Sequence, residues 1–186
     1  MKTLFNAVLP LFVLLVSTQG TTSYAHGDEV LYFEHLSVED GLPHTAIYEI
    51  LQDPLGFMWF GTEEGLAKYD GYEFTVYQRD PGNPNSLSGT AVHAMHQDAD
   101  RRLWLATRSN GINKFDPATE TFTRYRHDEN DPHSVSGNSF FLCNIYEDPQ
   151  GMLWFGTADA GLNRLDPDTE RFVAYRHDEN DPDSLS

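Results

Sequence analysis

The chain has 186 residues, and its 12 basic and 29 acidic side chains give a formal net charge of −17. Such an acidic surface repels phosphate backbones, which argues against nucleic acid as a partner. The single cysteine, Cys143, excludes an internal disulfide and any metal site built from several cysteines. Aromatic residues make up 13% of the chain, which favours strands over helices and indicates a β-rich fold.

The first 25 residues have the pattern of a secretory signal peptide. Lys2 precedes a mostly apolar stretch from Leu4 to Val16, and small residues then lead to an A-x-A-like site ending at Ala25. The apolar stretch is shorter than the roughly 20 residues that a membrane-spanning helix needs. We therefore expect export, cleavage after Ala25 and a periplasmic or extracytoplasmic location, with a buried N-terminal helix as the alternative.

The rest of the chain repeats one unit. Each copy is centred on a tryptophan, and Trp59, Trp104 and Trp154 lie at equivalent places in the three copies. An apolar alternation precedes each tryptophan, a Gly-containing segment follows it, and an aromatic pair closes the unit. The eight residues from Tyr125 recur unchanged from Tyr175. A repeat of this length and regularity indicates one structural unit used several times.

Each unit predicts four short strands separated by turns. In the first unit, strand A lies around Ile47–Gln52, a turn at Asp53–Gly56 leads to the tryptophan strand, and a loop at Glu63–Gly65 leads to the third. Asp116–Thr119 and Asp166–Thr169 predict type I turns before the fourth strand in the later units. Four antiparallel strands per repeat are typical of β-propeller blades, whereas a β-sandwich has no reason to repeat its sequence.

We therefore predict an all-β fold of about three blades, at residues 30–80, 86–128 and 134–178, with the start of a fourth at 183–186. The second unit departs from the others at one turn, where Arg101 stands in place of Gly56 and Gly151. A side chain at this position predicts a different turn or mild strain, with the turn starting instead at Ala99 and Asp100.

The phrases Leu153–Thr157 and Gly161–Asp166 resemble the two-component regulator propeller repeat, and Leu36–Pro43 is similar to the start of such sensors. The resemblance covers about residues 32–186. It implies the periplasmic sensory region of a membrane receptor whose output is a histidine kinase or a diguanylate cyclase, and several members of the family recognise carbohydrates. Because propellers need about four to eight blades, we expect an N-terminal piece of a longer receptor. Its membrane contact would lie downstream, and a receptor dimer is a further expectation.

The candidate ligand site follows from strand direction. In a meander, the loops between the second and third strands and the connections between blades emerge at the same end. These loops differ between units while the strands repeat, as a binding face on a repeated scaffold requires. We predict a small-molecule or oligosaccharide ligand there. The candidate residues are Glu63, Glu64, Arg108, Asn110, Asn138 and Asp159.

The sequence does not favour a metal site or a catalytic site. His93 and His96 are three apart on a strand and point to opposite faces, while His127 and His177 occupy equivalent places in separate units. The acidic loops lack the ordered spacing of a calcium loop, and the carboxylates recur as turn residues. We predict no catalytic residue, metal or cofactor. A propeller-type carbohydrate-active enzyme and an envelope scaffold remain the alternative functions.

The tryptophans are expected to pack between blades, with a sugar-stacking platform as the alternative. In an open arc of three blades, the two outer faces are expected to be exposed to water. The strands near Leu42–Leu51 and Phe140–Tyr146 would then lie at their inner rims. Exposed apolar faces of this kind favour association.

Overall fold

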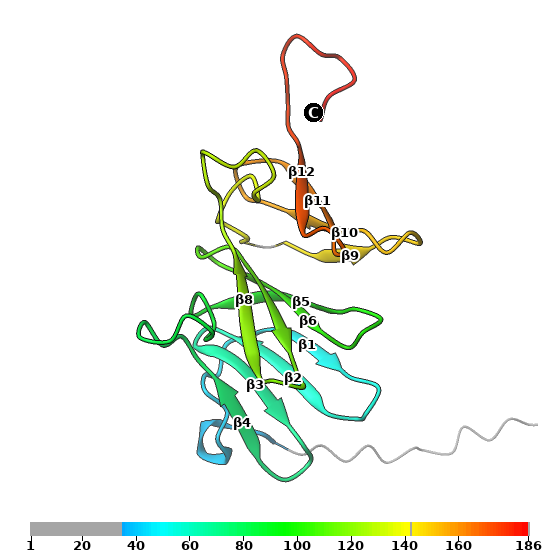
Figure 1. Cartoon of the computed structure of the whole chain (residues 1–186). Coiled ribbons are helices and arrows are strands. Elements are labelled where there is room, and N and C mark those ends of the chain that lie inside the picture. Colours follow the sequence, from blue (N-terminus) through cyan, green and yellow to red (C-terminus); the bar gives the residue numbers. More distant parts are fainter. Residues whose placement is uncertain (1–34, 142, 186) are drawn as a thin grey trace, which may run out of the picture. The chain divides into compact units, whose positions relative to one another are not determined.

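The computed structural model describes residues 35–141 and 143–185, and within them the chain forms twelve strands and one short 3-10 helix (Figure 1). The predicted signal peptide lies outside the described residues. The helix η1 spans Val38–Asp40 and precedes the first strand. The first sheet contains β1 (Ile47–Gln52), β2 (Met58–Thr62), β3 (Gly65–Tyr69) and β4 (Phe74–Tyr77); the second contains β5 (Val92–Gln97), β6 (Leu103–Thr107), β7 (Ile112–Asp116) and β8 (Thr121–Tyr125); the third contains β9 (Ile145–Glu147), β10 (Leu153–Gly156), β11 (Leu162–Asp166) and β12 (Arg171–Tyr175).

Each sheet is an antiparallel meander in which every strand pairs with the next one along the chain. The all-β prediction of three four-stranded sheets is therefore confirmed. The inner strand of the third sheet is shorter than expected, because β9 begins only at Ile145. Leu142, where the sequence pattern placed its start, lies outside the described residues.

Aromatic rings join the first sheet to the second. Trp59 of β2 stacks on Tyr77 of β4, with ring centroids 6.2 Å apart, and Phe115 of β7 meets the Trp59 ring edge-on at 5.6 Å. Trp59 is 2% exposed. Because burial of such large rings contributes much of the energy of a core, this junction holds the two sheets together.

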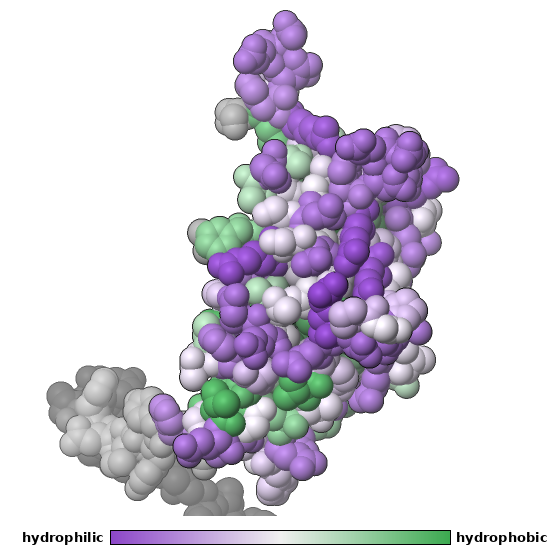
Figure 2. All heavy atoms as spheres, turned by 90° about the vertical axis from the view of Figure 1, so that its left-hand side faces the viewer, coloured by the Kyte–Doolittle hydropathy of each residue, from purple (hydrophilic) through white to green (hydrophobic). Residues whose placement is uncertain are grey.

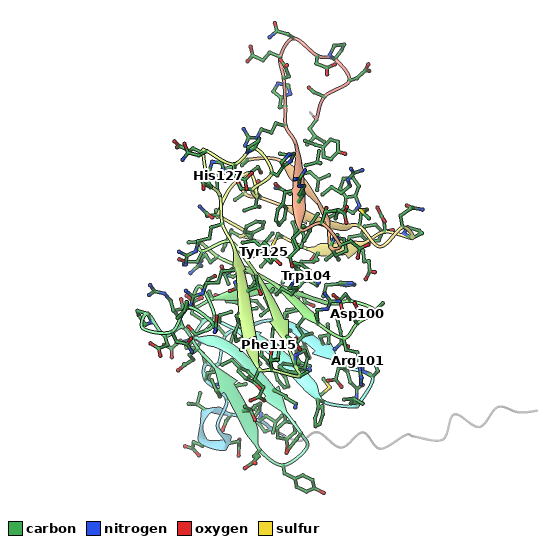
Figure 3. All side chains as sticks on the ribbon, in the orientation of Figure 1. Asp100, Arg101, Trp104, Phe115, Tyr125 and His127 are labelled. Carbon is green, nitrogen blue, oxygen red and sulfur yellow. The ribbon has the colours of Figure 1, made fainter. Side chains whose placement is uncertain are left out.

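The second sheet meets the third in the same way. Trp104 and Tyr125 lie against each other, with centroids 5.6 Å apart, and Phe155 of β10 approaches Trp104 at 6.3 Å (Figure 3). Trp104 is completely buried. The prediction that tryptophans pack between sheets is thus confirmed for Trp59 and Trp104, and neither ring is accessible as a sugar-stacking platform.

A carboxylate in the turn before each tryptophan strand holds the indole. Trp104 donates from Nε1 to Asp98 Oδ2 at 2.9 Å, and the corresponding distances are 3.0 Å for Trp59–Asp53 and 2.8 Å for Trp154–Asp148. The other oxygen of Asp98 accepts backbone N–H groups of the same turn. These aspartates are structural residues.

The turn at Arg101 is the same turn that the other two sheets make. Arg101 adopts φ 65° beside Asp100, and its N–H donates to the carbonyl of Asp98 at 2.9 Å (Figure 3). Gly56 and Gly151 make the equivalent bonds at 2.9 and 2.8 Å. The predicted change of turn type, with a start at Ala99 and Asp100, was wrong. The left-handed backbone of Arg101 agrees with the predicted mild strain.

The Ser-x-Ser segments between sheets fasten each connection to the sheet that follows. The amide side chain of Asn113 in β7 accepts from the Ser88 N–H and donates to its Oγ, both at 2.8 Å. Asn163 and Ser136 repeat this pair in the third sheet. These serines therefore have a structural role.

One of the two outer faces is less open than the sequence predicted. Leu42 is 3% exposed and packs with Phe60 of the first sheet, and Phe140 is completely buried. Among the described residues of the inner strands, Ile50 and Tyr146 are the most exposed large apolar side chains, at 52% and 60%. The expectation of exposed outer faces is therefore confirmed on the third sheet, where Tyr175 is 38% exposed. On the first sheet it was only partly right, because the segment before β1 folds back onto that face. Figure 2 shows a largely hydrophilic side of the molecule, with hydrophobic side chains gathered toward one end.

Candidate functional site

The loops and connections meet at one end of the sheets, which we call the loop end. In the second sheet, the Arg108 N–H donates to the carbonyl of Ala91 at 3.0 Å, and the Phe140 N–H donates to the carbonyl of Arg108 at 3.2 Å. In the third, the Ala158 N–H donates to the carbonyl of Ser139 at 3.0 Å. The loop between the second and third strands of each sheet is therefore bonded by its backbone to the segment before that sheet, as the Glu63 N–H bond to the Ala46 carbonyl shows for the first.

Two β-bulges shape the loop end at the innermost strands. The register of β1 on β2 shifts between Ile47 and Glu49, which leaves Tyr48 as the extra residue. The register of β5 on β6 shifts at the equivalent place and leaves His93. A bulge turns a side chain away from the regular alternation of its strand. Here it brings the Tyr48 and His93 rings into a stack, with centroids 4.0 Å apart and planes at 19°.

Three more side chains complete this group, which we call the Tyr48–His93 cluster. Phe141 lies 5.3 Å from the His93 ring, and the Arg108 guanidinium lies 5.3 Å from the Phe141 centroid. Arg108 Nη1 pairs with Glu63 Oε1 at 3.1 Å, and the Tyr48 hydroxyl donates to the other Glu63 oxygen. The cluster thus joins the first sheet, the second sheet and the connection to the third.

The charges of the cluster are set by these contacts. The Tyr48 hydrogen bond, helped by Arg108, lowers the pKa of Glu63, and the same bond raises the pKa of the Tyr48 hydroxyl. Burial lowers the pKa of His93, and the nearby Arg108 lowers it further. At neutral pH the cluster therefore holds a Glu63 carboxylate paired with Arg108, and a neutral imidazole.

His93 is the unusual member of the cluster. His93 is only 6% exposed, and its Nε2 atom has no hydrogen-bond partner among the described residues. Buried polar atoms are nearly always paired, so an unpaired one in a native structure needs a reason. Beside it, Tyr48 and Phe141 are 38% and 46% exposed. The cluster therefore offers aromatic surface, one ion pair and one unused imidazole nitrogen.

The predicted site residues divide into three groups. Glu63 and Arg108 belong to the cluster, and Glu64 lines an adjoining groove of about 360 Å3. Asn110 and Asn138 serve the backbone: the Asn110 carbonyl accepts from the Ser88 hydroxyl at 2.8 Å, and Asn138 Oδ1 accepts from the His127 N–H at 2.9 Å. Asp159 is exposed in the loop between β10 and β11.

Sequence reasoning missed Tyr48, His93 and Phe141. Regular strand alternation cannot reveal a bulge, and Phe141 lies in a connection. A signal was present, however, because the position after the first apolar residue of the inner-strand pattern holds a different residue in each unit, namely Tyr48, His93 and Cys143. Variation at one strand position within a repeat can mark a functional site as well as variation in loops does.

Three other histidines make structural contacts. His127 Nδ1 lies 2.8 Å from the Val135 carbonyl, and His177 Nδ1 lies 2.6 Å from that of Leu185. His96 Nε2 lies 2.7 Å from Glu147 Oε2. Among the residues that the structure describes, no three His, Cys, Asp or Glu side chains gather into a set that could hold a metal ion. No helix within the described ranges is long and apolar enough to cross a membrane.

Comparisons with known proteins agree with this architecture. The two-component regulator propeller model matches residues 41–64, 86–109 and 134–159. A crystal structure described as the extracellular domain of a hybrid two-component system of B. thetaiotaomicron is 32% identical, with a TM-score of 0.70, over 77% of this chain and 20% of that one. A second extracellular domain from the same organism, described as part of a one-component system, is 25% identical, with a TM-score of 0.61, over 79% of this chain and 18% of that one.

One curated relative is described as a histidine kinase. Histidine kinase P4 of Formosa agariphila is 38% identical over 56 residues, which cover 30% of this chain and 4% of that protein. The chain therefore spans a fifth or less of the length of each of these three proteins. In fold and repeat, it is like the extracellular domains of two-component system proteins.

Proposed function

We propose that this chain, which is built from two-component regulator propeller repeats, is the ligand-binding part of an extracytoplasmic sensor. The likeness to two extracellular domains supports a location outside the cytoplasm. The membrane anchor, a histidine kinase or diguanylate cyclase output, and a receptor dimer belong to the same proposal. Ligand binding here would be passed to an output carried by regions beyond this chain.

The observation that carries the proposal is the Tyr48–His93 cluster. Side chains from two sheets and the connection to a third meet there around an unpaired imidazole nitrogen. The repeated polar residues elsewhere, such as Asp98 and Asn113, already form hydrogen bonds with groups in the turns and connections. A ligand site needs polar atoms that are not already hydrogen-bonded within the protein, placed beside exposed aromatic rings.

The cluster suits a ligand with a ring and hydroxyl groups. The exposed faces of Tyr48 and Phe141 can pack against the C–H face of a sugar ring. Glu63 can accept and Arg108 can donate hydrogen bonds to its hydroxyl groups, and His93 Nε2 can bond a group that reaches inward. A small molecule or oligosaccharide is therefore the proposed ligand class.

Titration calorimetry of the purified protein against a panel of defined oligosaccharides tests this proposal. Phe141→Ala and Arg108→Ala should each weaken binding about tenfold or more, equivalent to about 1.4 kcal/mol. Leu55→Ala is the control, because Leu55 is an apolar residue even more exposed than Phe141, 65% against 46%, and lies in a turn at the opposite end of the first sheet.

The proposal fails if no member of the panel binds, or if Phe141→Ala and Arg108→Ala bind as tightly as the wild type and the Leu55→Ala control do. Thermal melting of each variant checks that the fold is kept. A carbohydrate-active enzyme would instead cleave the panel, and chromatography of the same mixtures would detect the products.

A further inference from the structure

The connections before the second and third sheets have the same backbone fold. The Ser86 N–H donates to the carbonyl of Asn83 at 3.2 Å, and the equivalent Ser134 N–H donates to that of Asp131 at 3.0 Å. One backbone N–H of the outermost strand also bonds each connection to its own sheet, at 2.8 Å for Phe122–Asn85 and 2.9 Å for Phe172–His133. The backbone carbonyl groups of residues 83–86 and 131–134 therefore lie at equivalent places.

In the second sheet, an arginine from the outermost strand occupies this place. Arg124 of β8 donates from Nε to the Ser86 carbonyl at 2.8 Å and from Nη2 to the Asn83 carbonyl at 2.9 Å. Nη2 also donates to the Ser86 hydroxyl at 2.8 Å. Under this guanidinium, Ser86 is only 8% exposed. The connection and the strand together thus form a guanidinium site that the chain fills itself.

In the third sheet, the arginine is replaced by Ala174, whose methyl group can make none of these bonds. A pocket of about 520 Å3 opens at this place, and its lining residues are Pro132, His133, Phe172, Val173, Ala174 and Arg176. Ser134, the equivalent of Ser86, is half-buried, and Ala174 is exposed. The connection has therefore kept its carbonyl groups while the sheet has lost the side chain that they bind.

The pocket side of β12 is turned toward the second sheet. Ala174 and Phe172 lie on the same face of this strand, because side chains two apart point the same way. The Phe172 ring meets Tyr125 of the second sheet, with ring centroids 5.8 Å apart. Both neighbours of the pocket, the second sheet and the connection, are thus described. The difference between the two sites comes from the exchange of arginine for alanine.

Charge around the pocket favours a cationic group. Residues 127–134 include the carboxylates of Asp128, Glu129 and Asp131 and no lysine or arginine. The equivalent residues 79–86 carry one acidic and one basic side chain, Asp80 and Arg79. The connection that receives no arginine from its own sheet therefore has the larger negative charge.

One arginine does line the pocket, but it is bonded elsewhere. Arg176 donates to the Ser136 carbonyl at 3.4 Å. The equivalent Arg126 donates to the Ser88 carbonyl at the same distance, next to the site that Arg124 fills. A guanidinium at this neighbouring position is thus compatible with a second one in the site.

We propose that the pocket beside Ala174 binds the guanidinium group of a ligand, supplied by free arginine or by an arginine side chain of a peptide. The carbonyl groups of Asp131 and Ser134 accept its N–H groups, as those of Asn83 and Ser86 accept the N–H groups of Arg124. A planar fork of donors fits these fixed acceptors better than an ammonium group does. The site uses no side chain of the Tyr48–His93 cluster, so it is independent of the sugar binding proposed there.

Nuclear magnetic resonance titrations of the isotope-labelled protein, followed at the Ser134 and Phe172 amides, test the proposal. The probes are L-arginine, the blocked peptide acetyl-Gly-Arg-Gly-amide and its lysine counterpart. At least one arginine probe should give saturable shifts of both signals. Binding of L-arginine alone would identify a free small molecule as the ligand, and binding of the peptide alone would identify a polypeptide. The lysine peptide should bind at least about tenfold more weakly than the arginine peptide.

Substitutions at the two equivalent strand positions sharpen the test. Ala174→Arg fills the pocket from within the chain and should abolish the shifts, whereas Ala174→Ser, the matched small variant, should keep them. Arg124→Ala should open the same pocket in the second sheet, so that an arginine probe also shifts the Ser86 and Phe122 amides. Thermal melting of each variant checks that its fold is kept.

Three results would overturn the proposal. The first is the absence of saturable shifts with both arginine probes. The second is a lysine peptide that binds as tightly as the arginine peptide, because the pocket would then select charge alone. The third is a folded variant that behaves like the wild type, either Ala174→Arg with unchanged binding or Arg124→Ala without the second set of shifts.

Discussion

The two ends of the sheets differ in how strictly the units repeat. At the turn end, the Asp53, Asp98 and Asp148 carboxylates all hold the indole of their own sheet at 2.8 to 3.0 Å. At the loop end, the corresponding loops carry Glu63-Glu64, Arg108–Asn110 and Ala158–Ala160. The contacts that repeat without change hold the sheets together, and the positions that vary carry the proposed recognition.

The loop end can vary because its backbone is fixed independently of its side chains. Arg108 and Ala158 make equivalent N–H bonds to the connections before their inner strands, although one side chain is a guanidinium and the other a methyl group. The side chains are thus free to change without altering the loop. Substitutions at the turn end should therefore cost more stability than substitutions at the loop end.

The largest effect is expected at a buried indole of the turn end. Trp104→Ala should lower the free energy of unfolding by about 3 to 5 kcal/mol, because a fully buried ring between two sheets is replaced by a cavity. Trp154→Ala should cost clearly less, since Trp154 is only half-buried. Urea denaturation of both variants measures the difference. Equal losses would contradict the distinction between a closed junction and an open face.

The second largest loss of stability is expected at the Asp98 carboxylate in the turn before the Trp104 strand. Asp98→Ala removes the acceptors for the Trp104 indole and for two backbone N–H groups, and should cost about 1 to 3 kcal/mol. Asp98→Asn keeps one carbonyl oxygen in place and should lose less. The same denaturation series, followed by tryptophan fluorescence, compares the two. If both variants match the wild type, the turn end does not depend on this residue.

A smaller effect of opposite sign is expected at Arg101. Arg101→Gly should raise the free energy of unfolding by about 0.5 to 1 kcal/mol, because φ 65° is unfavourable for a residue with a side chain. The reverse change, Gly151→Arg at φ 80°, should lower it by a similar amount. Thermal melting of the pair provides the measurement. A loss of stability in Arg101→Gly would show that the Arg101 side chain itself is needed.

The smallest effect should appear at the loop end as a dependence on pH. Burial, and then Arg108, lower the pKa of His93 in the folded protein, whereas in the unfolded chain it takes up a proton near about pH 6.5. The stability due to neutral His93 is therefore present above about pH 6.5 and is lost as the pH falls through the folded pKa.

Unfolding free energies of the wild type and His93→Gln, measured between about pH 7.5 and about pH 5, isolate this contribution. The wild type should lose more stability on acidification than the variant does. Identical pH profiles would mean that His93 is not held neutral by its surroundings. Because Glu63 and other carboxylates titrate in both proteins, the difference between the two profiles is the quantity that reports on His93.

The sequence by itself determined the number of sheets, the order of their strands and most of the turns. These features are local, because each strand and each Asp-Pro or Asp-Gly turn is specified by residues within about ten positions of one another in the chain. Even here local reasoning had a limit. The turn that starts at Asp116 ends in Glu120 at φ 52°, and this backbone places the Glu120 carboxylate 2.9 Å from the Tyr77 hydroxyl of the preceding sheet.

Only the tertiary structure decided the candidate site. Tyr48, His93 and Phe141 come from three repeats, and their contacts depend on how one sheet packs against the next and on a bulge in each of two strands. Of the residues predicted from the loops, Glu63 and Arg108 lie in the cluster, whereas the backbone carbonyl of Asn110 and the side chain of Asn138 bond to connecting segments. A repeated sequence specifies each sheet separately, whereas the site is made where the sheets meet, and that meeting is set by packing between residues far apart in the chain.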